Sequence, residues 1–132
     1  MAGRKKGPQS LTSLELLIMQ VLWREGPSNV LRVQKNLPPS SDLAYTTVQT
    51  MLNVLQRKGR VRRTLKGRAY EYRPVVSEEK VLRQAVRDLV ERMFGGSSEE
   101  LVMSLIKSRQ VDPARIADLS RIAASEEGEK DE

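Results

Sequence analysis

The chain has 132 residues, with 23 Lys and Arg against 17 Asp and Glu, and it contains neither His nor Cys. This length favours a single domain, or a small domain with an appendage. Without His or Cys there is no imidazole base, no thiolate nucleophile, no structural zinc site and no disulfide framework. Only carboxylates, Lys, Ser, Thr and Tyr remain for chemistry, and we expect no catalytic residue, no metal ion and no cofactor.

Apolar runs in the sequence are short. None approaches the roughly 18 residues that a membrane span needs. Residues 1–10 are basic and lack the apolar segment of a secretory signal. The expectation is a cytoplasmic protein without membrane insertion.

The charge is distributed unevenly between the two halves. Residues 1–74 carry 14 Lys and Arg against 4 Asp and Glu, a net charge of +10, whereas residues 75–132 carry 9 against 13, a net charge of −4. A basic surface attracts polyanions, because neutralised phosphates release their counterions. The first half is therefore a candidate for nucleic-acid binding.

The first expected helix follows a disordered basic arm (1–10) and begins near Thr12. Thr12 and Glu15 have the spacing of a capping box. Gly26-Pro27 ends the helix, and Trp23 is expected in the core. Apolar residues at helical spacing predict one buried face, formed by Leu14, Ile18, Val21 and Leu22.

A second helix is expected from Ser28, as its cap, to Leu37, with Val30, Val33 and Leu37 buried. The turn 38–42 then offers Ser41 or Asp42 as the cap of a third helix, residues 43–58, which ends at Gly59. Its apolar stripe consists of Val48, Met51, Leu52 and Leu55. Its opposite face is polar and consists of Thr46, Gln49, Thr50, Asn53 and Arg57. No acidic residue occurs between Leu43 and Lys66.

Two strands, residues 61–65 and 68–74, are predicted around a Lys66-Gly67 turn. This hairpin is rich in cations: Arg62, Arg63, Lys66, Arg68 and Arg73. Tyr70 and Tyr72 lie two residues apart and so share one face, where we expect them to cover the core.

The acidic half predicts three amphipathic helices, which begin at Ser77, at Ser97 and at Asp112-Pro113, and a charged tail (126–132) that frays. Their apolar stripes have little to pack against within so short a segment. We therefore infer that this region pairs with a second copy of the chain. The residues expected at that homodimer contact are Leu82, Leu89, Met93, Leu101, Leu105, Ile116 and Leu119.

Three helices followed by a basic hairpin match a winged helix-turn-helix, whose third helix enters the major groove of DNA. The predicted fold is mainly α with a small β-hairpin: a winged-helix domain (11–74) and an α-helical dimerisation domain (75–125). The expected DNA contacts of the recognition helix are Tyr45, Thr46, Thr47, Gln49, Thr50, Asn53 and Arg57. Those of the wing and its flank are Lys58, Arg62, Arg63, Lys66 and Arg68. Thr47 fits a packing role equally well.

The sequence resembles the penicillinase-repressor (BlaI/MecI-type) family of bacterial winged-helix regulators. The resemblance rests on LTSLELLIMQVLW, on LAYTTVQTMLNVLQRKG and on GRAYEYRP, and it continues through LVERMFGGSSEELVMSLI. It implies a homodimeric repressor on a double-stranded DNA operator, of genes such as those for β-lactamase and antibiotic resistance. It also implies relief by a membrane sensor protease that cleaves within residues 101–106. The pair aligned with the staphylococcal Asn-Phe bond is Ser104-Leu105, so the bond differs here or this chain is not cleaved.

Two other classes of protein compete with this interpretation. A non-specific nucleic-acid-binding or architectural protein would use the basic half only to coat phosphates. An enzyme is disfavoured, because the acidic residues of the first half are scattered without a pairing pattern: Glu15, Glu25, Asp42 and Glu71. A copper-sensing mechanism of the kind that a branch of the family carries on C-terminal Cys residues is excluded, since Cys is absent.

Overall fold

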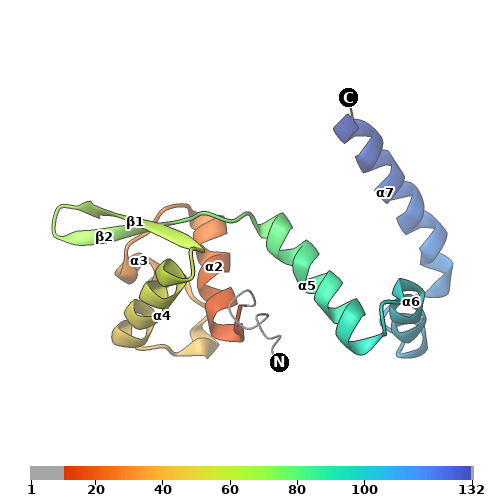
Figure 1. The fold of residues 1–132 in the computed structure, drawn as a ribbon, viewed down its shortest axis with the longest axis horizontal. Coiled ribbons are helices and arrows are strands. Elements are labelled where there is room, and N and C mark those ends of the chain that lie inside the picture. Colours follow the sequence, from red (N-terminus) through yellow and green to blue (C-terminus); the bar gives the residue numbers. More distant parts are fainter. Residues whose placement is uncertain (1–10, 132) are drawn as a thin grey trace. The chain divides into compact units, whose positions relative to one another are not determined.

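The computed structural model describes residues 11–131, and the predicted basic arm lies outside them (Figure 1). The chain divides into two compact units, Met1–Ala85 and Val86–Glu132, each of which is described by itself. In the first unit, a further helix begins after residue 77, and residues 11–77 form three α-helices and a hairpin: α2 (Ser13–Glu25), α3 (Val30–Asn36), the 3-10 turn η2 (Pro39–Ser41), α4 (Tyr45–Arg57), β1 (Val61–Lys66) and β2 (Ala69–Pro74).

The hairpin is antiparallel, and its register runs from Val61 opposite Pro74 to Lys66 opposite Ala69. Its loop is therefore Gly67-Arg68, one residue later than the predicted Lys66-Gly67 turn. Gly67 has a φ of 66°, as the first position of a type II′ turn requires, and that turn matches the twist of the two strands. The strand pairing, rather than the local sequence, sets which residue comes first in the loop.

The core of the first unit is formed where the three helices meet the base of the hairpin. It consists of Ile18, Met19, Val21, Leu22, Val30, Val33, Leu37, Val48, Leu52, Leu55, Val61 and Tyr72, with Trp23 packed against it. The prediction for Leu14 was wrong, because its side chain is 39% exposed. The inward positions of the first turn and a half of α2 are those of Glu15, Ile18 and Met19, and Leu14 lies about 100° away from Glu15 around the helix.

Helix capping agrees with the sequence at α2 and differs at the next two helices. Thr12 and Glu15 form the predicted capping box, with bonds of 3.0 and 3.1 Å. Asn29, not Ser28, caps α3 by accepting from the Arg32 N–H. Neither Ser41 nor Asp42 caps α4, whose N-cap is Ala44 without a side-chain bond.

Ser28 has a different role from the one expected. It is buried, and its backbone exchanges two hydrogen bonds of 2.9 and 2.8 Å with Tyr72 in an isolated bridge. The segment before α3 thereby holds the edge of β2. Buried backbone N–H and C=O groups need hydrogen-bond partners. Ser28 finds them in β2, although it does not belong to a strand itself.

The remaining elements are α5 (Glu78–Met93), α6 (Ser98–Lys107), η3 (Pro113–Arg115) and α7 (Ile116–Asp131). The predicted caps are confirmed at Ser77 and Asp112, and Ser97 caps α6. Each of the three accepts a backbone N–H from the first turn. The tail expected to fray is instead helical as far as Asp131.

The second unit buries few apolar side chains. Among its described side chains, residues 86–128, only Val90 is buried, at 8% exposure. Met93 is 71% exposed, and several further apolar side chains are also exposed: Val86, Leu89, Val102, Met103, Leu119 and Ile122. This unit has apolar faces without a core to receive them.

Candidate nucleic-acid interface

Helix α4 has two clearly different faces. Val48, Leu52 and Leu55 are fully buried and hold the helix on the domain. The predicted contact residues on the other side are largely exposed: Tyr45, Thr46, Gln49, Thr50 and Arg57. Thr47 is half-buried, as the packing alternative for that residue expected, and so is Met51.

The exposed face of α4 carries no carboxylate, since the chain has no acidic residue between Asp42 and Glu71. Arg57 makes no ion pair within the described part of the chain. Hydroxyl and amide groups can donate to and accept from base edges, and a carboxylate among them would repel phosphate. The face is therefore suited to the major groove.

Strand alternation gives the hairpin two faces. Val61, Arg63 and Tyr72 lie toward the helices, whereas Arg62 and Arg73 lie on the outer face, directly opposite each other. Like charges in that position repel each other. Neither Arg62 nor Arg73 has an ion-pair partner among the residues that the structure describes. Their arrangement favours the binding of an anion.

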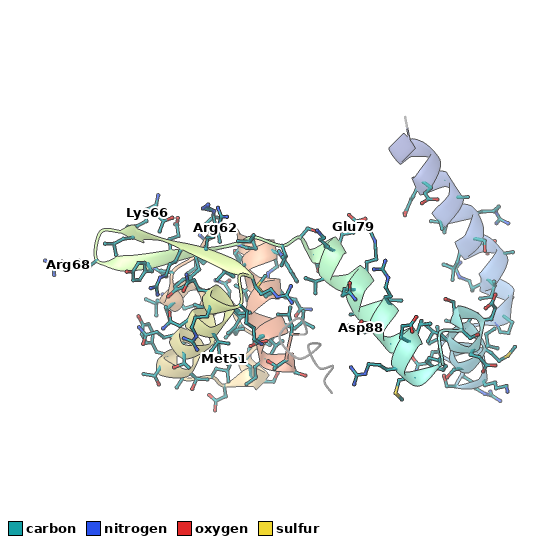
Figure 2. All side chains as sticks on the ribbon, in the orientation of Figure 1. Met51, Arg62, Lys66, Arg68, Glu79 and Asp88 are labelled. Carbon is teal, nitrogen blue, oxygen red and sulfur yellow. The ribbon has the colours of Figure 1, made fainter. Side chains whose placement is uncertain are left out.

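The tip of the hairpin carries Lys66 and Arg68, both exposed (Figure 2). Lys66 Nζ lies 3.9 Å from Glu71 Oε1 across an exposed surface, where such a pair contributes little and leaves most of the cation's field intact. Arg68 is unpaired within residues 11–128. Both side chains are available to phosphates.

Asn53 joins α4 to the hairpin. Its Oδ1 accepts from Arg63 Nη1 and from the Tyr72 hydroxyl, each at 3.1 Å. The Arg63 guanidinium also lies 4.2 Å above the Tyr70 ring. The sequence predicts Asn53 and Arg63 as two separate DNA contacts. Their hydrogen bond joins residues 10 apart in different elements, and no local sequence pattern indicates it.

Tyr70 and Tyr72 lie on the same face of β2 but differ in solvent exposure. Tyr72 is 2% exposed and belongs to the core, as expected, whereas Tyr70 is exposed and so does not cover the core. The two rings are 6.4 Å apart. Tyr70 lies two residues closer to the loop of the hairpin, and the Arg63 guanidinium stacks on its ring.

The Lys58 side chain forms an ion pair with Glu15 within the first unit. Its Nζ lies 3.1 and 3.0 Å from the two carboxylate oxygens of Glu15, a residue that is 3% exposed. The sequence identified Glu15 only as part of a capping box and missed this partner 43 residues away. We therefore leave Lys58 out of the proposed phosphate contacts.

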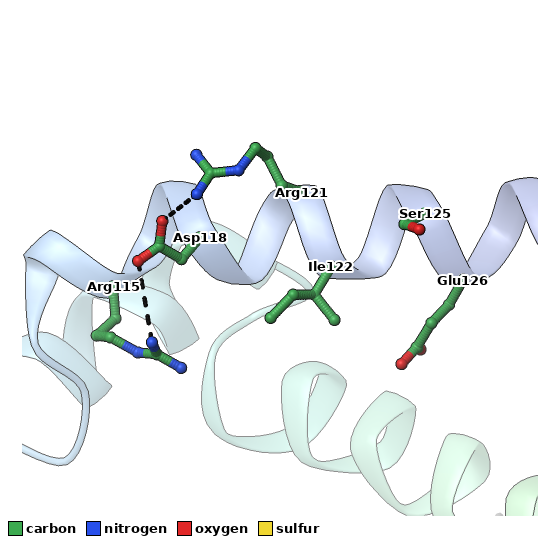
Figure 3. A pocket seen from close by; sticks show the side chains of 6 residues that line it. All are labelled: Arg115, Asp118, Arg121, Ile122, Ser125 and Glu126. Carbon is green, nitrogen blue, oxygen red and sulfur yellow. Dashed lines mark hydrogen bonds and ion pairs between the residues drawn. The ribbon is translucent and has the colours of Figure 1, made fainter.

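A shallow hollow lies along one side of α7 and the turn before it (Figure 3). It is lined by Arg115, Asp118, Arg121, Ile122, Ser125 and Glu126. Both arginines pair with Asp118, so their charge is already compensated. All six residues come from one short stretch of helix, which gives the hollow no opposite wall of its own.

Within the described residues, no cluster of three or more acidic side chains has the arrangement of a metal site. None of the described helices combines the length and the apolar character that crossing a membrane requires.

Three helices, the third of which has a polar exposed face, are followed by a basic hairpin. This arrangement defines a winged helix-turn-helix DNA-binding protein. The family model described as "Penicillinase repressor" matches residues 11–125. The chain belongs to the penicillinase repressor family, which consists of transcriptional repressors rather than enzymes.

Two curated relatives agree with this assignment. The penicillinase repressor of Bacillus licheniformis is 28% identical over 97% of this chain and 99% of that protein. The transcriptional regulator BlaI of Mycobacterium tuberculosis is 32% identical over 79% of this chain and 77% of that protein. Among solved structures, the DNA-binding domain of the repressor BlaI is 36% identical, with a TM-score of 0.48, over 56% of this chain and 89% of that one.

Proposed function

We propose that this protein is a sequence-specific DNA-binding repressor that acts in the cytoplasm as a homodimer on a palindromic operator. The observation that carries the proposal is the exposed, carboxylate-free face of α4 beside a hairpin with uncompensated arginines. Thr46, Gln49 and Thr50 would read base edges, because their side chains both donate and accept hydrogen bonds.

The phosphate contacts would come from side chains around that face. Tyr45 and Arg57 flank it on α4, and the hairpin adds Arg62, Lys66 and Arg68. These groups lie on exposed positions and would fix the register of the protein without reading sequence. Arg63 belongs to the same set.

Dimerisation is supported by the second unit, which exposes the apolar side chains that a core would bury. The residues proposed at the contact include the exposed Leu82, Leu89, Met93 and Leu119 and the half-buried Leu101, Leu105 and Ile116. A two-fold axis through this region would set two reading helices about 34 Å apart, one turn of DNA. The operator is then a palindrome with half-sites one turn apart.

Genes of the β-lactam-resistance type are the proposed targets, by relation to the family. Proteolytic relief by a membrane sensor protease would act on α6, which contains Ser104 and Leu105. The Leu105 carbonyl accepts from the N–H groups of Gln110 and Val111. A protease needs an extended substrate, so α6 and its last turn would have to unwind before this bond is cut.

The test is selection of bound duplexes from a random library at low and at moderate salt. A dyad-symmetric motif that persists at moderate salt supports a dimeric, sequence-specific repressor. Binding without an enriched motif at either salt would instead favour a protein that only coats phosphates, and α4 would lose its reading role.

A further inference from the structure

The Asn53 side chain hydrogen-bonds from the reading helix α4 to both strands of the wing. It is half-buried, one turn from the exposed Thr50 and Gln49. Its Oδ1 accepts hydrogen bonds from Tyr72 in the core and from Arg63 on the hairpin. An amide oxygen has two lone pairs, so this acceptor is fully used.

This bonding conflicts with a role in reading bases. Asparagine recognises adenine through two bonds at once, with its oxygen accepting from N6 and its amide donating to N7. The oxygen of Asn53 can accept from a base only if Arg63 or Tyr72 is released. Tyr72 is 2% exposed, and a buried hydroxyl without a partner is costly.

Resting on the proposed function, we infer that Asn53 is a positioning residue, a clasp that fixes the wing to α4 and aims Arg63 at the phosphates. The clasp consists of Asn53, Arg63, Tyr70 and Tyr72. The Asn53 oxygen and the Tyr70 ring hold the guanidinium from two sides, and both are uncharged. Arg63 is therefore oriented while its full positive charge remains available, whereas a carboxylate at position 53 would cancel that charge.

The clasp is tested first without DNA, by a double-mutant cycle of Asn53→Ala and Tyr72→Phe in urea unfolding of the full chain. Tyr72→Phe removes one hydroxyl and leaves the surface of α4 unchanged. We expect the two variants to be non-additive, because each removes the same bond. Additive effects would overturn the clasp, whatever happens with DNA.

The second test measures binding to the selected operator and to a random duplex of the same length. Asn53→Ala and Tyr72→Phe should each weaken both complexes by a similar factor, about threefold to tenfold for the loss of one or two ordinary hydrogen bonds. A base reader would behave differently: Asn53→Ala would weaken only the operator complex, and Tyr72→Phe would change neither.

Asn53→Asp separates orientation from charge. A carboxylate can accept both bonds, so stability should be retained, while the salt dependence of DNA binding falls by at least one phosphate contact, because the carboxylate neutralises Arg63 and also repels phosphate. An unchanged salt dependence would contradict the role of Arg63, and Arg83→Ala on α5 is the matched control. If the unaltered chain bound no duplex, the proposed function would fail, whereas the unfolding cycle would still decide the clasp.

Discussion

The ammonium of Lys58, at the C-terminal end of α4, lies 3.0 Å from a carboxylate oxygen of Glu15 in the first turn of α2. The Glu15 side chain is nearly inaccessible to water, whereas that of Lys58 is 24% exposed. Glu15 also accepts from the Thr12 N–H. One carboxylate thus caps the first helix and anchors the end of the reading helix.

Replacing Lys58 by Met should therefore destabilise the domain. The carboxylate of Glu15 would remain buried without its cation, which costs about 2–3 kcal/mol once the partial exposure of Lys58 is considered. Urea unfolding measures the effect, and Lys35→Met, at an exposed lysine of α3, is the control. The salt dependence of DNA binding should be unchanged, and a fall by one contact would restore Lys58 as a phosphate ligand.

Arg68→Ala should weaken binding to every duplex alike. Arg68 lies in the hairpin loop, exposed and without an ion pair in the described chain. Its loss should reduce the slope of log affinity against log salt by about one. Fluorescence anisotropy at several salt concentrations measures this slope. If affinity and slope both stay the same, the hairpin tip does not touch the phosphates.

Gln49→Ala should change sequence preference instead. Gln49 is exposed on α4 and is not one of the residues that this helix buries, so stability should change by less than about 0.5 kcal/mol. Discrimination should fall at one base pair of each half-site, by about 1–3 kcal/mol if the contact is bidentate. The readout is a repeated library selection, with Gln20→Ala on α2 as the control. An identical motif would remove Gln49 from the readers.

Leu89→Asp should abolish the dimer. Leu89 is an exposed apolar residue of α5, and burying such a side chain contributes about 1.5–3 kcal/mol in each copy. Sedimentation equilibrium should report a monomer, and affinity for the full palindrome should fall toward that for a half-site. Arg87→Asp, about 200° away around the helix, should leave both unchanged. A monomer that binds the palindrome tightly would refute the dimer model.

The sequence predicted what local patterns determine. The capping box of Thr12 and Glu15 and the caps at Ser77 and Asp112 depend on side chains within three residues of the groups that they bond. The buried stripe of α4 follows from helical periodicity. These features were correctly located because short-range geometry alone sets them.

Contacts between distant segments could not be predicted in this way. The Glu15–Lys58 pair, the Ser28–Tyr72 bridge and the Asn53–Tyr72 bond each join different elements of the first unit. Each of these residues has a plausible local role: Glu15 in a capping box, Ser28 as a helix cap and Asn53 as a base reader. Nothing in the neighbouring sequence indicates their tertiary contacts. Leu14 was misplaced for a related reason, since Glu15 takes the inward position that an apolar residue was expected to fill.

Trp23 is the single tryptophan of the chain, and its indole N–H donates to the Val76 carbonyl at 2.9 Å. Val76 follows the last strand and precedes α5. The emission wavelength of this single tryptophan therefore reports on whether Val76 stays bound to α2. A red shift of the emission, followed in real time without any added dye, would record the release of the segment that leads out of the hairpin.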